Sequence, residues 1–221
     1  MIIKKYFPSL IGINVFDQHS SYEEELFKRC LEIKNKTKSG GDNWLSYKTY
    51  NTLGTYNFLQ DTTFAPIKKF IYDSLKQYCK ELDIDMSKLN LTPKNAWFNY
   101  YQRGNYQEFH IHQSALSMIY LLKGNNEGSK LVFETPQNPM YQIPYKSFNE
   151  DTFRTLSFDM VPGTLVIFDS TLKHSVTQHD SFEPRITLAL NLEMKRRLLL
   201  IYMHGLLKLM KYIHLHMFKI F

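Results

Sequence analysis

Short apolar runs with strand periodicity dominate the middle of the chain. Turn-forming segments at 103–105, 124–128 and 161–163 separate several of these runs. Short strands at regular spacing are typical of a β-sandwich or barrel. We therefore expect a mainly β core over residues 95–194. The predicted strands are 95–101, 107–112, 115–122, 130–134, 164–168 and 185–193.

Two helices are predicted before this β region. The first would follow Ser20 or Ser21 and run to about Ile33, with acidic residues in its first turn, where the helix dipole favours them. Pro66 can open a second helix, which apolar residues at helical spacing extend to about Glu81. Both helices fall in a support region that we expect to cover the β core.

The pattern changes again after residue 194. A basic cluster at 195–197 is followed by a stretch rich in Leu, Ile, Met and His, which Lys208, Lys211 and Lys219 interrupt. These charges argue against a membrane-spanning helix. We expect a tail that packs on the domain or is poorly structured, and membrane-surface contact is the less favoured alternative.

Support region 1–94, β core 95–194 and tail 195–221 thus form one domain, or one domain with an appended tail. Aromatic residues make up 15% of the chain, which suits strands. The net charge is +6, but much of the excess lies in the tail, so no nucleic-acid motif is inferred. Cys30 and Cys79 are far apart and form no CxxC pair, and the N-terminus lacks an apolar signal segment. Both features favour a reducing, cytoplasmic location.

Three histidines are candidate metal ligands. His110 and His112 are one residue apart on an extended segment, so their side chains point to the same side. His174 follows the apolar strand 164–168 after a short polar loop and would complete a facial site. Neutral imidazole suits Fe, Zn, Cu and Ni, and three protein ligands leave open positions. Surface or core histidines also produce such pairs by chance, and His179 is an alternative third ligand.

Arg185 is a second candidate because it opens the last predicted strand, with Thr187 on the same face. An arginine that faces a barrel interior is a costly buried charge unless an anion meets it. Its fork of donors matches a carboxylate. The alternative is a surface arginine paired with Glu183.

In order and spacing, these residues resemble the iron(II)- and 2-oxoglutarate-dependent oxygenases, in their prolyl-hydroxylase-like branch and a related group often encoded by phages. The resemblance covers about residues 97–193, and the ordered set carries it rather than any single motif. It rests on Tyr101, Gly104, His110 and His112, then Pro162-Gly163 with the apolar strand that follows, His174, and Arg185-Ile186-Thr187.

The resemblance implies a double-stranded β-helix (jelly roll) in which His110, His112 and His174 hold Fe(II). It implies that 2-oxoglutarate is the co-substrate and that Arg185, helped by Thr187, binds its distal carboxylate. Tyr120 or Tyr101 would add a hydroxyl donor. The partners would be dioxygen and an unknown primary substrate, which is hydroxylated as 2-oxoglutarate is decarboxylated to succinate. The location would be the host cytoplasm if the chain is phage-encoded.

One departure from the family pattern is His112, which stands where the family has Asp or Glu. It indicates a three-histidine iron site, a site for another metal, or a carboxylate supplied by Glu134 or Asp169; the register favours His112 as the ligand. Two other functions stay open. One is a three-histidine cupin-type dioxygenase that does not need Arg185, and the other is a non-catalytic jelly-roll binding module.

Overall fold

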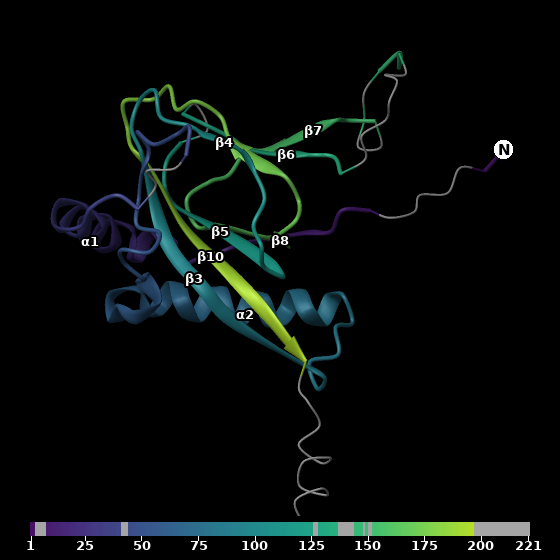
Figure 1. The fold of residues 1–221 in the computed structure, drawn as a ribbon, viewed down its shortest axis with the longest axis horizontal. Coiled ribbons are helices and arrows are strands. Elements are labelled where there is room, and N and C mark those ends of the chain that lie inside the picture. Colours follow the sequence, from purple (N-terminus) through teal and green to yellow (C-terminus); the bar gives the residue numbers. More distant parts are fainter. Residues whose placement is uncertain are drawn as a thin grey trace, which may run out of the picture.

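The protein consists of two antiparallel sheets that face each other, with two helices over the outer face of the larger one (Figure 1). This computed structural model describes residues 1–2, 8–40, 44–125, 128–136, 144–147, 149 and 152–196. Its helices and strands are β1 (Ile11–Val15), α1 (Glu23–Lys36), β2 (Tyr50–Asn51), α2 (Ala65–Glu81), β3 (Leu89–Tyr101), β4 (Gln107–His110), β5 (Leu116–Lys123), β6 (Leu131–Glu134), β7 (Thr155–Phe158), β8 (Thr164–Asp169), β9 (His174–Val176) and β10 (Arg185–Arg196), with short 3-10 helices η1 (His19–Ser21), η2 (Phe58–Gln60) and η3 (Thr62–Phe64).

The larger sheet has the order β1-β8-β5-β10-β3-β2, and the smaller has the order β4-β9-β6-β7. Every strand pair in both sheets is antiparallel. From β3 to β6 and again from β7 to β10, successive strands alternate between the two sheets, as in a jelly roll. The predicted fold class, mainly β with N-terminal supporting helices, is confirmed.

The larger sheet has two faces with different chemistry, because successive side chains of a strand alternate. On β10 the residues Ile186, Leu188, Leu190 and Leu192 join the apolar core with the helices. We call this the helix face. The intervening residues line a cavity between the two sheets, and we call that side the cavity face; on β10 it comprises Arg185, Thr187, Ala189 and Asn191.

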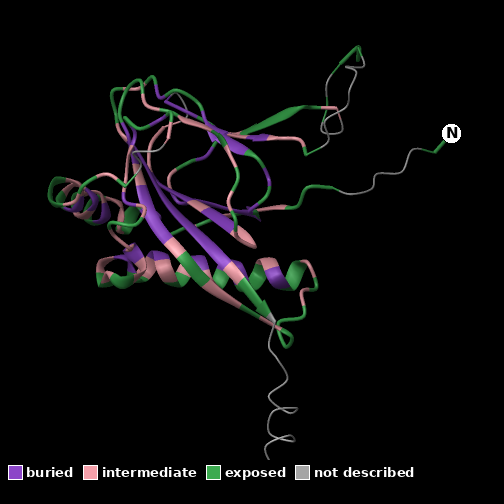
Figure 2. Cartoon of the chain, viewed as in Figure 1, coloured by how far each residue is buried: buried purple, intermediate pink, exposed green. Residues whose placement is uncertain are grey.

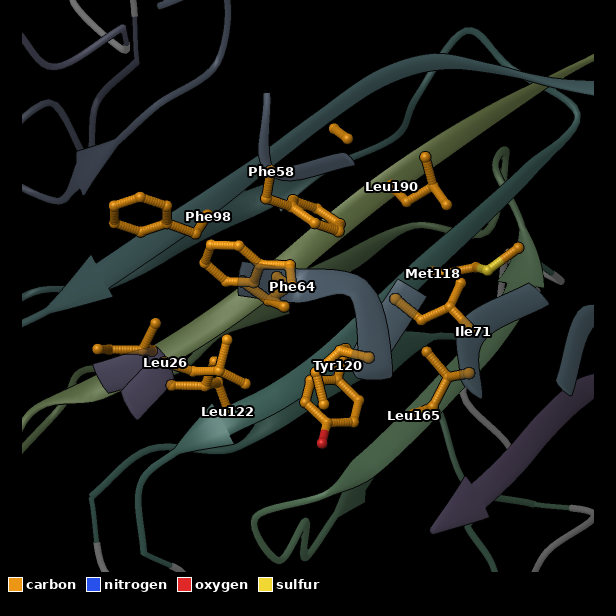
Figure 3. Close-up of a cluster of buried hydrophobic side chains, with 14 of the residues drawn as sticks. Leu26, Phe58, Phe64, Ile71, Phe98, Met118, Tyr120, Leu122, Leu165 and Leu190 are labelled. Carbon is orange, nitrogen blue, oxygen red and sulfur yellow. The ribbon is translucent and has the colours of Figure 1, made fainter. Parts of the chain in front are cut away.

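Amphipathic helices explain why the helix face is closed. On α2, Ile67, Ile71 and Leu75 lie at helical spacing and are buried against the sheet. Figure 2 shows both helices buried toward the sheet and exposed on the other side. Figure 3 shows Phe98 and Leu190 from the sheet in one cluster with Phe58, Phe64 and Ile71 from the helical layer.

The predicted helices agree closely with α1 and α2, and Pro66 stands in the first turn of α2. The predicted turn at 103–105 is present, with Gly104 at a positive φ of 85° that favours glycine. The structure differs in that β3 begins at Leu89 and that β7 and β9 are strands, none of which the apolar pattern indicates.

Residues 197–221 of the tail lie outside the described ranges, so the prediction for the tail stays a prediction. Within the described ranges, no helix combines the length and the apolar character needed to cross a membrane.

Candidate metal and 2-oxoglutarate site

A cavity of about 350 Å³ lies between the two sheets. The cavity face of the larger sheet forms one wall, and β4 and β9 of the smaller sheet supply histidines to the other. Among its lining residues in the described part of the chain there is no Asp or Glu. The cavity therefore combines imidazoles, amides and hydroxyls with a single buried arginine.

Strand pairing brings the three predicted histidines together. His110 ends β4 and lies directly opposite His174, the first residue of β9. His112 follows two residues after His110, and its backbone N–H donates to the carbonyl of Ser170 at 2.8 Å. One ring nitrogen from each of the three histidines lies within 4.8 Å of the other two. The geometry is that of a site that can hold one metal ion.

Backbone hydrogen bonds fix the tautomer of two of these histidines. Nδ1 of His110 lies 2.8 Å from the carbonyl oxygen of Glu108, and Nδ1 of His174 lies 2.9 Å from that of Leu172. A carbonyl only accepts, so each Nδ1 carries the proton and each Nε2 keeps a free lone pair. This arrangement orients metal-binding histidines in many proteins.

Burial also keeps the three rings neutral. Burial lowers the pKa of all three histidines. The pKa of His112 falls to about 4, with a further contribution from the neighbouring His110, and the pKa of His174 falls to about 3. Neutral imidazole is the form that binds metals. The donor set therefore fits Fe(II) with three neutral ligands.

Arg185 lies in the same cavity, and no acid among the described residues pairs with its charge. Its side chain is 1% exposed. Its Nη1 donates to the carbonyl of Ser129 at 3.1 Å, its Nη2 lies 3.8 Å from Sδ of Met160, and its Nε has no hydrogen-bond partner in the described part of the chain. Burial lowers the pKa of Arg185 to about 10, so the guanidinium is still charged at neutral pH. A buried cation without an acid partner is a site prepared for an anion.

Two neighbours of Arg185 add polar groups on the cavity face. Tyr101 lies opposite Arg185 in the β3–β10 pair, and burial raises the pKa of its hydroxyl to about 12, so the hydroxyl stays protonated. Thr187 accepts a hydrogen bond from the Asn99 side chain at 3.1 Å. Both hydroxyls can donate to an anion that reaches Arg185.

Comparison with known proteins gives the family of this site. Residues 95–191 match the family model described as "Putative 2OG-Fe(II) oxygenase". This region, which holds the candidate site, is therefore similar to the 2OG-Fe(II) oxygenases. The match begins in β3 and ends in β10, so it includes the three histidines, Arg185 and Thr187. The predicted enzyme class and its cofactors, iron(II) and 2-oxoglutarate, are confirmed.

Solved structures of 2OG-Fe(II) oxygenases share the fold. A prolyl-4-hydroxylase from Pseudomonas putida is 13% identical with a TM-score of 0.58, over 83% of this chain and 92% of that one. A viral collagen prolyl hydroxylase from Paramecium Bursaria Chlorella virus-1, in complex with 2OG, is 14% identical with a TM-score of 0.51, over 83% and 94%. HygX from Streptomyces hygroscopicus, with nickel and 2-oxoglutarate bound, is 10% identical with a TM-score of 0.56, over 84% and 82%. No curated protein matches the chain by sequence.

Tyr120 is not part of the oxygenase cavity, so its predicted role as a hydroxyl donor to 2-oxoglutarate is corrected. Its side chain points to the helix face of β5, among buried apolar residues (Figure 3). Its hydroxyl lies 2.7 Å from Nδ1 of His19. The alternation of side chains explains the difference, because Tyr101 and Tyr120 fall on opposite faces of one sheet.

The alternative ligands also lie elsewhere. His179 is buried, with Nε2 at 2.7 Å from the carbonyl of Glu183 and Nδ1 at 3.1 Å from the Ser129 hydroxyl, so both ring nitrogens have partners. Glu134 pairs with Lys173 at 2.6 Å, and Asp169 accepts hydrogen bonds from Thr171. Neither carboxylate lines the cavity. Among the candidates for the second ligand, His112 is the one that lies with His110 and His174.

Asn99 and Trp44 are among the cavity residues that the sequence analysis did not identify. Asn99 accepts from Trp97 Nε1 at 3.1 Å while it donates to Thr187, and its position two residues before Tyr101 signals the same face. Trp44 packs its ring at 5.0 Å from His110 and comes from a remote loop, where no sequence signal points to the site. The loop is held because the carboxylate of Glu108 accepts the backbone N–H of Leu45 at 2.8 Å.

Proposed function

We propose that the protein is a dioxygenase that hydroxylates its primary substrate as 2-oxoglutarate is decarboxylated to succinate. The observation that carries this proposal is the buried, unpaired Arg185 in the same cavity as three histidines with free ring nitrogens. A metal site alone would not need a buried cation. A dicarboxylate that bridges the two explains both.

His110, His112 and His174 would hold Fe(II) from one side. Hydrogen bonds to backbone carbonyls orient His110 and His174 before metal arrives, so little side-chain freedom is lost on binding. Three neutral ligands leave open positions for co-substrate and dioxygen. Iron(II) and 2-oxoglutarate together supply the oxidation: dioxygen, 2-oxoglutarate and a substrate C–H group become succinate, carbon dioxide and a substrate hydroxyl.

Arg185 would bind the distal carboxylate through its guanidinium, whose Nε has no hydrogen-bond partner among the described residues. The hydroxyls of Tyr101 and Thr187 would donate to the same carboxylate, and Asn99 orients Thr187. These contacts place the other end of the co-substrate toward the histidines. They position the reacting groups and raise their effective concentration.

Aromatic side chains restrict access of water to the histidines. Trp44 packs edge-on against His110, and Trp97 packs edge-on against His112 at 5.8 Å between ring centroids. Phe168 contacts His174 from the interior at 4.8 Å. A partly enclosed apolar surround keeps a reactive oxidant away from bulk solvent.

The three-histidine cupin-type dioxygenase is the second candidate, and His112 is the residue that favours it. The cupin-type function leaves Arg185 without a role, because a reaction that does not use a dicarboxylate gains nothing from a buried guanidinium. The two candidates therefore differ in their need for 2-oxoglutarate.

The test is turnover of 2-oxoglutarate by the Fe(II) protein in the presence of oxygen. We expect slow succinate formation without a primary substrate, and we expect an excess of Zn(II), which binds the same imidazoles but does no redox chemistry, to abolish it. Bound metal and oxygen consumption without succinate would support the cupin-type alternative. Bound metal with no oxygen consumption would remove the proposed dioxygenase activity.

A further inference from the structure

The cavity has a second polar end, remote from Arg185. Asn191 follows six positions after Arg185 along β10, and both line the cavity. At about 3.3 Å per strand residue, their backbones are about 20 Å apart. A five-carbon dicarboxylate held by Arg185 and the histidines does not reach that far, so the remote end is left for another molecule.

An apolar row divides the two ends. Trp97, Ala189 and Ile119 are cross-strand neighbours on β3, β10 and β5, and all three line the cavity. The next row on the same face is polar again: Asn95 lies opposite Asn191, which lies opposite Ser117. The bound molecule would thus contact an apolar surface first and a polar row at its end.

The polar row carries no charge and is partly prearranged. The hydroxyl of Ser117 donates to Oδ1 of Asn191 at 2.8 Å and lies 2.8 Å from the hydroxyl of Ser170. Because the amide oxygen of Asn191 is engaged on the β5 side, its amide nitrogen is the group left for a ligand. Ser117, Ser170 and Asn191 are all at least 94% buried, so this network is fixed in place.

Asn95 supplies the complementary atom. Its Oδ1 is buried and has no hydrogen-bond partner among the described residues. A buried acceptor without a donor costs free energy until something donates to it. Because Asn95 and Asn191 are directly opposite residues of neighbouring strands, an acceptor and a donor lie side by side. An amide group presents the matching donor and acceptor in one plane.

We propose that this remote end binds an uncharged amide group of the primary substrate, either a carboxamide or a peptide unit, between Asn95 and Asn191. The assignment of the remote end to the substrate rests on the proposed function, in which Arg185 holds the co-substrate. A carboxylate would place an acceptor against the Asn95 oxygen. A cation would meet Arg185 and Lys94 in a cavity whose described lining holds no acid.

Three isosteric probes separate these chemistries: benzamide, benzoate and benzamidine. Their ring fits the apolar row, and they differ in the charge and in the donors and acceptors of one planar group. Binding is measured by ligand-observed NMR on the Zn(II)-loaded protein, with and without 2-oxoglutarate. With 2-oxoglutarate bound, so that Arg185 is occupied, we expect benzamide to bind at least about tenfold more tightly than the other two, which is the range of one buried hydrogen bond.

Two variants of Asn95 and one control variant test whether Asn95 binds the amide. Asn95→Leu should weaken benzamide binding about tenfold, and Asn95→Asp should reverse the preference in favour of benzamidine, because a carboxylate accepts from both of its donors. Asn90→Asp introduces the same charge at an exposed position of β3 and should change neither. Equal binding of the three probes, or an unchanged preference in Asn95→Asp, would overturn the proposal.

The same samples separate this proposal from the proposed function. If 2-oxoglutarate binds but the protein does not bind benzamide more tightly than benzoate and benzamidine, only the proposed amide site is wrong. If benzamide binds as expected and 2-oxoglutarate does not, the amide site stands and the co-substrate assignment of Arg185 fails.

Discussion

The two faces of the larger sheet are built from the same strands but have opposite chemistry. On β3 the helix face carries Ala96, Phe98 and Tyr100, which pack in the apolar core. The cavity face of the same strand carries Asn95, Trp97, Asn99 and Tyr101, three of which offer amides or a hydroxyl to the cavity. A shift of one residue in register would exchange the two sets.

The comparison shows where this fold gains stability and where it gives stability up. The helix face buries apolar area, which is the main favourable contribution to folding. The cavity face buries an unpaired guanidinium and an unpaired amide oxygen, which oppose folding until ligands arrive. We therefore expect substitutions on one face to change mainly stability and substitutions on the other to change mainly binding.

The largest effect is expected on the helix face. Phe98 is fully buried between β3 and the helical layer, so Phe98→Ala should lower the free energy of unfolding by about 3–5 kcal/mol. Urea denaturation of the two proteins measures the difference. The neighbouring Asn99→Ala, on the cavity face, is the matched control and should cost clearly less. Equal losses of unfolding free energy in Phe98→Ala and Asn99→Ala would contradict the division between the two faces.

Arg185→Met should weaken 2-oxoglutarate binding at least about a hundredfold, because the loss of one partner of a buried charged pair costs about 3–5 kcal/mol. The ligand-free protein should be as stable as the wild type or more stable, since a buried unpaired charge is removed. Calorimetry on the Zn(II) form and thermal denaturation measure the two effects. Arg103→Met, at an exposed position, is the control. A less stable variant with intact 2-oxoglutarate binding would assign Arg185 to structure instead.

A smaller, pH-dependent effect is expected in the helical layer. Burial alone would raise the pKa of Asp61, but hydrogen bonds from Tyr56, Thr63 and Arg29 outweigh it and lower that pKa below its usual range. Its contribution to stability is thus complete above the unfolded pKa of about 4 and is lost as the pH falls below it. Asp61→Asn should cost about 1–2 kcal/mol at pH 7.

Urea denaturation of Asp61→Asn and wild type between pH 7 and pH 3 measures this difference, which should shrink at the acid end. A difference that stays constant over this range would show that the charge of Asp61 is not responsible.

The smallest effect is expected at Thr187. Thr187→Val keeps the shape but removes the hydroxyl that Asn99 orients, so 2-oxoglutarate binding should weaken about three- to tenfold. Metal affinity should be unchanged in the same calorimetric series. Thr177→Val, at an exposed position directly after β9, serves as the comparison. No change at Thr187 would limit carboxylate recognition to Arg185 and Tyr101.

The sequence predicts which residues share a face wherever they lie on one strand, because side chains alternate with a period of two. Arg185 and Thr187 could be assigned to one face from spacing alone, and the same rule indicates Asn99 and Asn191. The same rule does not say which of the two sets of residues on a strand faces the cavity. For this reason Tyr120 was expected in the cavity as an alternative to Tyr101, although it packs under the helices.

Other features depend on contacts that spacing does not encode. The position of Trp44 depends on a loop that hydrogen-bonds to Glu108, which is 63 residues further along the chain. The pairing of His110 with His174 follows from the way β4 and β9 meet in the smaller sheet, and the short strand β9 has too little apolar pattern to indicate it.

Titration of 2-oxoglutarate into the Fe(II) protein without oxygen tests the central claim most directly, because a metal-to-ligand absorption band appears only when both bind in one site. We predict a saturable band in the wild type and in His179→Asn, whose histidine is structural. We predict no band in His174→Ala, which should remain folded by circular dichroism. Absence of the band in the folded wild type, or an unchanged band in His174→Ala, would contradict the account.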